Sequence, residues 1–599
     1  MGIRNLIALM AAALSILVTT ACGGGGGASQ MPPPPAIGVE LSQRSLTLPQ
    51  DGVTTVAVDV TVTRPAGTSR SVDLSVLPLP SGVTAEIESP GVGNTGKVTF
   101  AATPQNNGAG AHQVTIHAGD GVSTGSAGLV LNVVIVATVG ASLTGQRIDT
   151  LMSTSFQPAS WTDQFFLRHP GATSPLDDLE PRHINVQVLE RDIPQLTEAT
   201  STSAGSWDFT YIDGILNPIF TAGDHSPLYQ IAMGPPFMYS TPGHFRDPTF
   251  QEFADYCARL VQYYNTGGFT DGAGKFHKSS SPWPITYWGI YNEPNINGLT
   301  ASEYVSLYNL VVPRMLAADP NLKFVAVELA DFSDEPQRYL PTFVGNLTAP
   351  VDVVATHYYS SCNQRDTDQQ LFDTIPGFVN HVHYIYSQLQ SNPALENVPV
   401  WVTENNVNAD WSDNGISVCN GTPFVTDRRG SSAFFAAWRP LVFSRLAQAG
   451  ARALHHWSFN ADSQFGEVDD ATAQTYLSYW VDYWLARYFP SPPGSDLLQL
   501  EVSDSATVEI LATLRGSDNA YVIMLANHAV HASTDNNGAG DPRTVRLDVS
   551  ALGPLTSATQ LTLDAHTNTA AGPQPQAITP APQIEITLPG YGVTFLELR

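Results

Sequence analysis

Short runs of alternating apolar and polar residues fill two stretches of the chain, 38–137 and 491–599. In the first they are Val56–Val62, Ser71–Val76, Gln113–His117 and Leu129–Val134, and in the second Leu498–Val502, Ala520–Leu525, Val545–Val549, Gln560–Leu563 and Val593–Leu598. Strict alternation is typical of a strand with one buried face, because successive side chains point to opposite sides. Gly, Pro and Asn separate the runs, and this spacing predicts an antiparallel β-sandwich in each stretch.

Between the two stretches, over 138–490, strand-like runs alternate with stretches of helical periodicity. This order predicts a parallel sheet with crossover helices. Eight strand–helix units fit a (β/α)₈ barrel with inserted loops. A doubly wound open sheet is the alternative, but no Gly-rich phosphate fingerprint follows the first strand. The expected strands are Thr138–Leu143, His183–Val188, Leu228–Met233, Ile285–Tyr291, Lys323–Val327, Val351–His357, Val398–Thr403 and Ala453–Trp457.

Two helices of this middle stretch have recognisable starts. Thr249 with Glu252, and Thr300 with Glu303, have the spacing of capping boxes, in which hydroxyl and carboxylate pair with free backbone donors. A further helix is expected to end at Gly450, a usual C-terminal cap.

The first 22 residues have the features of an export signal. Arg4 precedes an apolar run, Leu6–Val18, and small residues lead to Cys22. Cys22 before five glycines resembles a bacterial lipoprotein site, with Thr19 as a departure from that pattern; a plain signal peptide is the alternative. Residues 23–37 are Gly-rich and then Pro-rich, which predicts a linker. We expect an exported protein, either secreted or a bacterial cell-surface or outer-membrane lipoprotein that touches the membrane only through a lipid on Cys22.

Charge excludes one class of partner. The 599 residues include 27 Lys and Arg against 54 Asp and Glu, a formal net charge of −27. Such a surface repels phosphate backbones, so nucleic acid is not an expected partner. No cysteine has zinc-ligand spacing, and neither a metal nor another cofactor is expected.

The remaining cysteines suggest one disulfide. Cys362 and Cys419 fall in loops expected on the same face of the barrel. In an oxidising compartment they would form a bridge that stabilises by about 4 kcal/mol in the loop-entropy model. Two unpaired thiols are the alternative. Cys257 lies in a helical pattern and is expected to be buried.

Two glutamates at strand ends carry the candidate chemistry. Glu293 follows the fourth strand in the segment Trp288–Asn295, beside Asn292, and Glu404 follows the seventh. Side chains at the C-terminal ends of barrel strands form the active sites of such folds. The fourth and seventh strands face each other across an eight-stranded ring, so both carboxylates are expected to reach one substrate. A pair of carboxyl groups is what a retaining glycosidase requires.

These two motifs resemble clan GH-A glycoside hydrolases, and most closely glycoside hydrolase family 39, which holds β-xylosidases and α-L-iduronidases. The similarity continues through Trp207–Asp213, Thr356–Tyr359 and His455–Phe459. It implies that Glu293 is the acid/base and Glu404 the nucleophile. The segment Leu79–Ala85 resembles bacterial immunoglobulin-like repeats, which implies an Ig-like sandwich that acts as a spacer or a glycan-binding module.

The resemblance also implies the substrate contacts. Asn292 would bind the hydroxyl next to the reacting carbon, His357 and Tyr359 would orient nucleophile and sugar, and Trp457 would lie under the ring. Family members carry Arg and His on the second strand, where this chain has Asn185 and Gln187, so the usual sugar preference does not carry over.

Glu328, at the end of the fifth strand, is a further carboxylate near the expected mouth of the barrel. It would either bind a substrate hydroxyl, pair with a cation or form a structural salt bridge. Two other functions compete with a glycosidase. A glycan-binding surface lipoprotein with a degenerate barrel would explain the altered second strand, but has no need of a paired acid and nucleophile. A metal-dependent esterase lacks both a His-rich ligand set and a Gly-x-Ser-x-Gly elbow. The sugar, its anomer, exo or endo action and the oligomeric state are left open.

Overall fold

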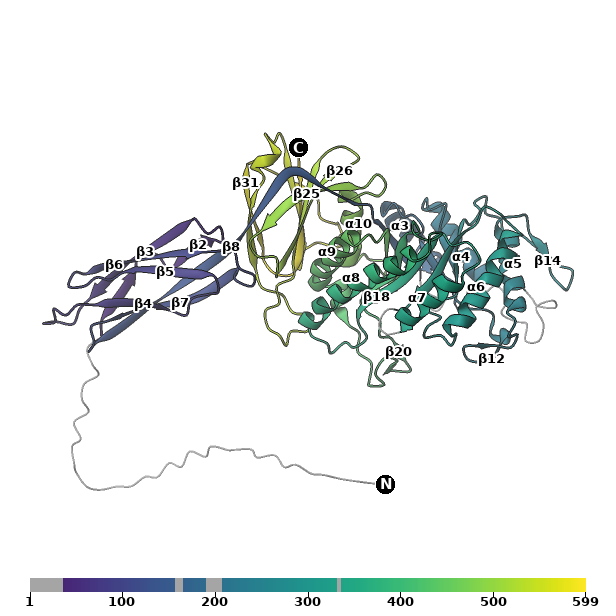
Figure 1. Cartoon of the computed structure of the whole chain (residues 1–599), viewed down its shortest axis with the longest axis horizontal. Helices are drawn as coiled ribbons and strands as arrows, with labels where there is room; N and C mark the ends of the chain where they lie inside the picture. Colours follow the sequence, from purple (N-terminus) through teal and green to yellow (C-terminus); the bar gives the residue numbers. More distant parts are fainter. Residues whose placement is uncertain (1–35, 157–164, 190–206, 331–334) are drawn as a thin grey trace, which may run out of the picture.

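The computed structural model describes residues 36–156, 165–189, 207–330 and 335–599. Cys22 and the expected signal segment lie outside the described residues. Figure 1 shows three parts in a row: an N-terminal β domain, a C-terminal β domain and a barrel surrounded by helices. None of the helices in the described ranges combines the length and apolar character that crossing a bilayer requires.

The N-terminal part consists of two facing β-layers. One layer has the order β1-β3-β6-β5, and the other contains β2, β4, β7 and the first part of β8. Alternate residues of each strand point inward, and Val60, Phe100 and Leu131 are among the side chains of the core between the layers. The strands are β1 (Gly38–Leu41), β2 (Ser45–Pro49), β3 (Thr55–Thr63), β4 (Asp73–Leu77), β5 (Val83–Glu88), β6 (Thr95–Ala102), β7 (Gly110–Gly119) and β8 (Thr124–Ile148).

Strand β8 joins the two β domains. Its first part pairs with β2 and β7, and its second part pairs with β28 and β25 of the C-terminal domain. The expectation that Thr138–Leu143 is the first barrel strand is therefore wrong. β8 continues through these residues without a turn, and the first barrel strand is β9 (Leu151–Phe156).

The C-terminal domain is built on a sheet of order β30-β29-β32-β27-β26-β25-β8-β28-β31. One face packs on the barrel helices: Tyr488 of α10 stacks on Phe595 of β32, with ring centroids 4.7 Å apart. The strands are β25 (Ser495–Val502), β26 (Val508–Arg515), β27 (Tyr521–Asn527), β28 (Arg543–Asp548), β29 (Ala558–Asp564), β30 (Gln576–Ile578), β31 (Gln583–Leu588) and β32 (Gly592–Leu598).

The middle of the chain forms a closed barrel, as the sequence predicts. Its eight strands are all parallel and follow the order β9-β10-β11-β16-β17-β18-β19-β22. Beyond β9 they are β10 (Asn185–Gln187), β11 (Leu228–Ile231), β16 (Tyr287–Ile290), β17 (Lys323–Leu329), β18 (Val353–Ser361), β19 (Val400–Asn408) and β22 (Ala453–His456). Their near-continuous apolar runs fit strands that are covered on both faces.

Helices cover the outside of the barrel (Figure 1). They are α2 (Phe165–Arg168), α3 (Thr173–Asp178), α4 (Thr210–Thr221), α5 (Gln251–Tyr264), α6 (Ala301–Leu316), α7 (Glu335–Asn346), α8 (Asp368–Gln390), α9 (Ala433–Gln448) and α10 (Leu477–Tyr488). Small paired strands decorate the loops: β12 (Tyr239–Thr241) with β13 (His244–Phe245), β14 (Phe269–Thr270) with β15 (Phe276–His277), β20 (Ser412–Asp413) with β21 (Ile416–Ser417), and β23 (Asn460–Ala461) with β24 (Val468–Asp469).

One of the two predicted capping boxes forms. Thr300 and Glu303 cap α6 reciprocally. The predicted box at Thr249 is wrong, because α5 begins after Phe250, and Asp247 accepts the hydrogen bond of the Glu252 amide instead. Glu252 forms an ion pair with Arg246, so its carboxylate does not make the hydrogen bond that a capping box requires.

Candidate active site

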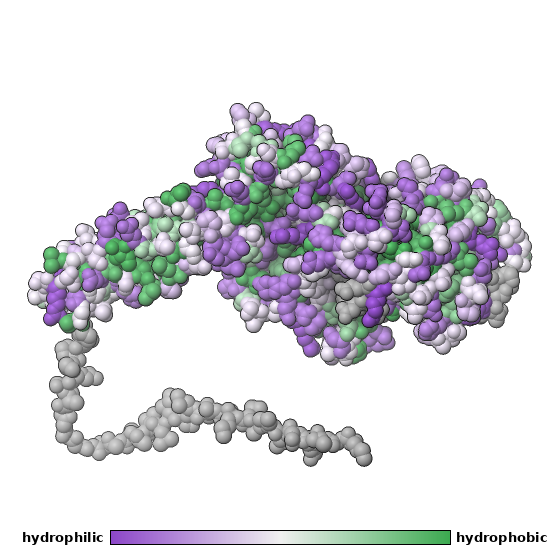
Figure 2. Space-filling view, viewed as in Figure 1, coloured by the Kyte–Doolittle hydropathy of each residue, from purple (hydrophilic) through white to green (hydrophobic). Residues whose placement is uncertain are grey.

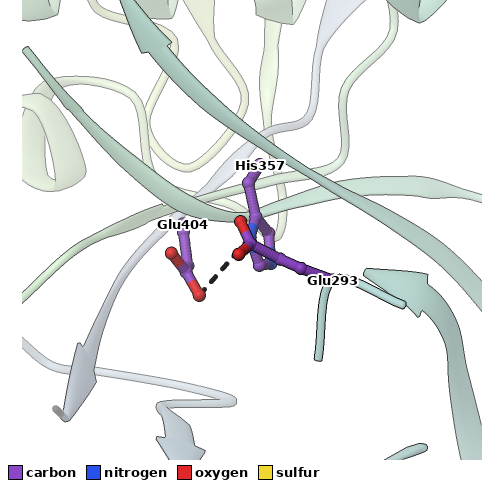
Figure 3. Close-up of side chains that lie close together, drawn as sticks. All are labelled: Glu293, His357 and Glu404. Carbon is purple, nitrogen blue, oxygen red and sulfur yellow. Dashed lines mark hydrogen bonds and ion pairs between the residues drawn. The ribbon is translucent and has the colours of Figure 1, made fainter. Parts of the chain in front are cut away.

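Glu293 and Glu404 meet at the C-terminal end of the barrel. Glu404 lies in β19, whereas Glu293 follows β16 in a turn where its φ is 43°. The Glu293 amide donates to the carbonyl of Glu328 over 3.0 Å, which fixes the turn to the next strand. One oxygen of each glutamate and a ring nitrogen of His357 all lie within 4.8 Å of one another, as Figure 3 illustrates. Strand ends far apart in sequence thus bring the two carboxylates to one point.

Both oxygens of Glu404 are held by hydrogen bonds. The Tyr359 hydroxyl donates to Oε2 over 2.7 Å, and the Gln187 amide donates to Oε1. His357 Nδ1 lies 3.4 Å from Oε1. The Glu404 side chain is 7% exposed, against 15% for Glu293. Glu404 is therefore oriented and nearly dry, while Glu293 keeps more access to solvent.

His357 is fully buried and contacts three carboxylates. Its Nδ1 lies 2.9 Å from Glu293 Oε1, and its Nε2 lies 3.4 Å from Glu328 Oε2. Burial opposes a charged ring, but the charge of Glu404 and the contacts with Glu293 and Glu328 outweigh it and raise the pKa of His357 well above its usual value. The three surrounding carboxylates therefore favour the protonated form of His357.

The environment of Glu404 favours its protonated form more than water does. Burial raises its pKa to about 7; the charge of His357 opposes this rise, and the charge of Glu293 adds to it. A proton is therefore held on Glu404 up to near neutral pH.

Three amide side chains and one indole form the wall beside the glutamates. Asn292 Oδ1 accepts a hydrogen bond of 3.0 Å from Gln230 and one of 3.4 Å from Gln187. Trp457 Nε1 donates to Gln187 Oε1 over 3.3 Å. The Trp457 ring is partly exposed and stands edge-on to Phe465, with centroids 4.9 Å apart. Gln187 therefore connects Asn292, Glu404 and Trp457.

Sequence reasoning missed Gln230 and treated Asn185 and Gln187 only as departures from a pattern. All three are buried polar residues on the short strands β10 and β11. Asn185 donates to the carbonyl of Thr403, next to Glu404, over 3.2 Å. A buried polar side chain in an apolar strand needs a partner, and that signal was present in the sequence.

Glu328 does not enter the mouth of the barrel. Its side chain is completely buried beneath His357, and Thr403 donates a hydrogen bond to its Oε2. The structure therefore does not place Glu328 in contact with a substrate hydroxyl. Its carboxylate pairs with the imidazole of His357 instead.

Two other features bear on cofactors and cysteines. In the described part of the chain, two groups have the spacing of metal ligands: Glu293 with His357 and Glu404, and His456 with Glu467 and Asp482. In both, the imidazole nitrogens are already occupied, by carboxylates in the first and by Asp482 and the Phe465 carbonyl in the second. Cys362 and Cys419 form a disulfide with their Cα atoms 5.7 Å apart, and Cys257 is a buried free thiol.

A hollow of about 550 Å³ lies beside the site. Loops after β11 and β16 line it with mostly apolar side chains, among them Met233, Pro236, Tyr239 and Tyr291. Tyr291 and Asn297 of its lining stand on either side of Glu293 in the sequence. The space-filling view in Figure 2 shows mixed polar and apolar patches on the visible face of the barrel.

One protein-family model matches part of the barrel. The profile of the family described as glycosyl hydrolase catalytic core matches residues 267–422. No curated protein sequence matches the chain. Among solved structures, a family 44 endoglucanase from Clostridium thermocellum is similar over 78% of this chain and 100% of its own, with 10% identity and a TM-score of 0.48. A family 44 xyloglucanase from Paenibacillus polymyxa is similar over 78% of this chain and 99% of its own, with 11% identity and a TM-score of 0.48.

The matched segment contains Glu293, His357 and Glu404, the three groups that meet at the end of the barrel. The family match and this geometry agree on one chemistry: the chain is a glycosidase.

Proposed function

We propose that this glycosidase retains anomeric configuration and cleaves O-glycosidic bonds of a poly- or oligosaccharide through a covalent glycosyl-enzyme. The main support for this proposal is the short distance between the two glutamates: an oxygen of Glu293 and an oxygen of Glu404 lie within 4.8 Å of each other. Retaining enzymes hold their two carboxyl groups about 5–5.5 Å apart, whereas inverting enzymes need about 6.5–9.5 Å to admit a water molecule.

In the first step, Glu404 attacks the anomeric carbon and Glu293 protonates the departing glycosidic oxygen. The bond from carbon to that oxygen breaks, and an ester bond to Glu404 forms. The hydrogen bonds from Tyr359 and Gln187 support the assignment of Glu404 as nucleophile, because they hold both of its oxygens in place. The higher exposure of Glu293 suits a group that must exchange its proton with solvent.

In the second step, the ester removes the charge of Glu404, and Glu293 acts as the base that takes a proton from water. The resulting hydroxide equivalent attacks the anomeric carbon and frees Glu404 and the sugar. Trp457 offers an aromatic face for the apolar side of a pyranose, and Asn292 offers an amide for the adjacent hydroxyl. The hollow lined by Tyr291 and Asn297 leaves room for further sugar units of the substrate.

The finer assignments are part of the same proposal. The family 39 resemblance supports Glu293 as acid/base, and the Leu79–Ala85 motif supports an Ig-like N-terminal domain. The signal-like segment ending at Cys22 supports an exported protein, secreted or anchored by lipid at the bacterial cell surface.

Azide rescue tests the mechanism directly. After a screen of released sugars across plant and bacterial polysaccharides identifies a substrate, the 2,4-dinitrophenyl glycoside of the released sugar is used. Glu404→Ala should lose nearly all turnover. Glu293→Ala should still react with the activated glycoside, and azide should then yield a glycosyl azide of retained configuration. Wild-type activity in either variant, or an inverted sugar from the wild-type enzyme, contradicts the proposal. Tight glycan binding by the wild-type protein with no released sugar would favour a binding function.

A further inference from the structure

We propose, on the basis of the function above, that Glu328 is a positioning residue whose carboxylate keeps His357 as an imidazolium between Glu293 and Glu404. Glu328 touches no substrate in this arrangement and acts through His357.

The backbone of β17 is distorted to present this side chain. The pairing of β17 with β18 changes register between Ala326 and Leu329, and the φ angles of Val327 and Glu328 are 78° and 45°. Such left-handed residues other than glycine cost on the order of 1–3 kcal/mol each and cluster at functional sites. The Tyr304 hydroxyl accepts a hydrogen bond of 2.8 Å from the Val327 amide and so holds the distortion.

The same distortion also helps to hold the turn that carries Glu293. The carbonyl of Glu328 accepts the hydrogen bond of the Glu293 amide, over 3.0 Å. Glu328 therefore touches the candidate site twice, through its backbone at Glu293 and through its side chain at His357. A bulge that re-aims a side chain next to an active site is a common functional device.

The carboxylate occupies a space shaped for it. It is fully buried; Oε2 accepts from Thr403, and Oε1 has no hydrogen-bond partner among the described residues. A Cβ at Gly289 would lie 3.1 Å from Oε1, so the glycine of β16 leaves the room that this oxygen needs. An unpaired buried carboxylate oxygen costs stability, which indicates that this residue is there for a reason other than stability.

When Glu293 and Glu328 are both ionised, the contacts of His357 are satisfied by one protonation state. The charged groups that face the ring are Glu293 from the turn after β16, Glu328 from β17 and Glu404 from β19. Ionised carboxylates only accept hydrogen bonds, and a neutral imidazole has a single N–H. Only the imidazolium can donate to Glu293 through Nδ1 and to Glu328 through Nε2 at once.

An imidazolium here supports both steps of the reaction. Its charge favours the ionised form of Glu404, which attacks in the first step. It also stabilises the Glu293 carboxylate that must act as base once Glu404 is esterified. Without Glu328, Nε2 loses its anionic acceptor, and the ring gives up its proton at lower pH.

NMR of ¹⁵N-histidine-labelled full-length protein tests this without reference to catalysis. Comparison with His357→Gln assigns the His357 signals. We expect wild-type His357 to be doubly protonated at pH 8, and the titration midpoint to fall by about 1 pH unit or more in Glu328→Gln, since one nearby charge shifts a pKa by that amount. Glu467→Gln, which removes a different buried carboxyl of the barrel domain, should leave the midpoint unchanged.

A neutral His357 in the wild-type protein at pH 7, or an equal midpoint in Glu328→Gln, overturns the proposal. The wild-type spectrum alone shows whether His357 is neutral at pH 7, so this outcome can be tested even where Glu328→Gln does not fold. In activity assays, the alkaline limb of kcat/KM should move to lower pH in Glu328→Gln but not in Glu467→Gln. Absence of any wild-type turnover would count against the proposed function, whereas the NMR result stands by itself.

Discussion

The Tyr359 hydroxyl lies 2.7 Å from Oε2 of Glu404 and donates a hydrogen bond to it. The two residues come from neighbouring strands, β18 and β19, and both side chains are almost completely buried. The bond fixes the direction of the proposed nucleophile and stabilises its ionised form.

Removing this hydroxyl should slow the reaction and move its pH dependence. Hydrogen bonds to charged groups contribute about 1.5–3 kcal/mol, so Tyr359→Phe should lower kcat/KM by roughly 10- to 100-fold. The bond lowers the pKa of Glu404, so the acidic limb should move to higher pH in the variant. Tyr358→Phe is the matched control, because the Tyr358 hydroxyl bonds Ser360 and Thr374 instead. An unchanged acidic limb in Tyr359→Phe would contradict the assignment.

The wild-type enzyme should lose activity on the acid side of neutrality. Burial raises the pKa of Glu404 to about 7. The proton therefore stays on this carboxyl up to near neutral pH, and only the ionised form attacks. We expect kcat/KM to fall as pH falls through about 7, measured on the free enzyme at low substrate concentration. An acidic limb near the ordinary glutamate value would show that burial does not control the nucleophile.

Gln187 should act together with Tyr359. Gln187→Leu keeps the approximate volume but removes the donor to Glu404 and the acceptor for Trp457. We expect a loss in kcat/KM of roughly 10-fold or more. Tyr359 and Gln187 hold the same carboxylate. The loss of transition-state stabilisation in the double variant Gln187→Leu, Tyr359→Phe should therefore differ from the sum of the two single losses by about 0.5–3 kcal/mol. Strict additivity in this cycle would mean that the two residues do not share a function.

The disulfide should stabilise the loops after β18 and β19. Cys362 and Cys419 are separated by 57 residues, for which the loop-entropy model gives about 4 kcal/mol. The double variant Cys362→Ser, Cys419→Ser should melt at lower temperature and be cleaved sooner by protease within this segment. Cys257→Ser is a control for the loss of a thiol without loss of a bridge: its melting temperature should stay near that of the wild type and should still fall when a reducing agent is added. Equal melting of wild-type protein with and without reducing agent would contradict the prediction.

Glu467 should make the fold less stable as pH rises. Burial, with the nearby charge of Asp482 adding to it, raises the pKa of this carboxyl well above its usual value. The folded state therefore binds the proton more tightly than the unfolded state, and stability declines from the unfolded pKa up to the folded one. Glu467→Gln should flatten this decline between pH 5 and pH 9 in denaturant titrations. If Glu467→Gln instead changes the free energy of unfolding by the same amount at every pH, ionisation of Glu467 is not the cause of the decline.

Much of the barrel and its candidate site could be predicted from local sequence. Apolar runs followed by polar residues mark barrel strands, and Glu293 follows β16 as this pattern predicts. Glu404 was expected to follow the seventh strand, but β19 continues to Asn408 and contains it. The capping box of Thr300 and Glu303 depends on residues within one turn of a helix, and it forms as predicted.

What depends on pairing between distant strands could not be predicted. A period-two pattern shows that Thr138–Leu143 is a strand, but the pattern has no information on which sheet it joins. The position of Glu328 depends on the φ angles of two residues and on the register of β17. The sequence alone thus determined which residue types stand at the strand ends. The tertiary structure decided which of them face the cavity and which lie beneath it, because contacts far apart in the chain set register, backbone twist and burial.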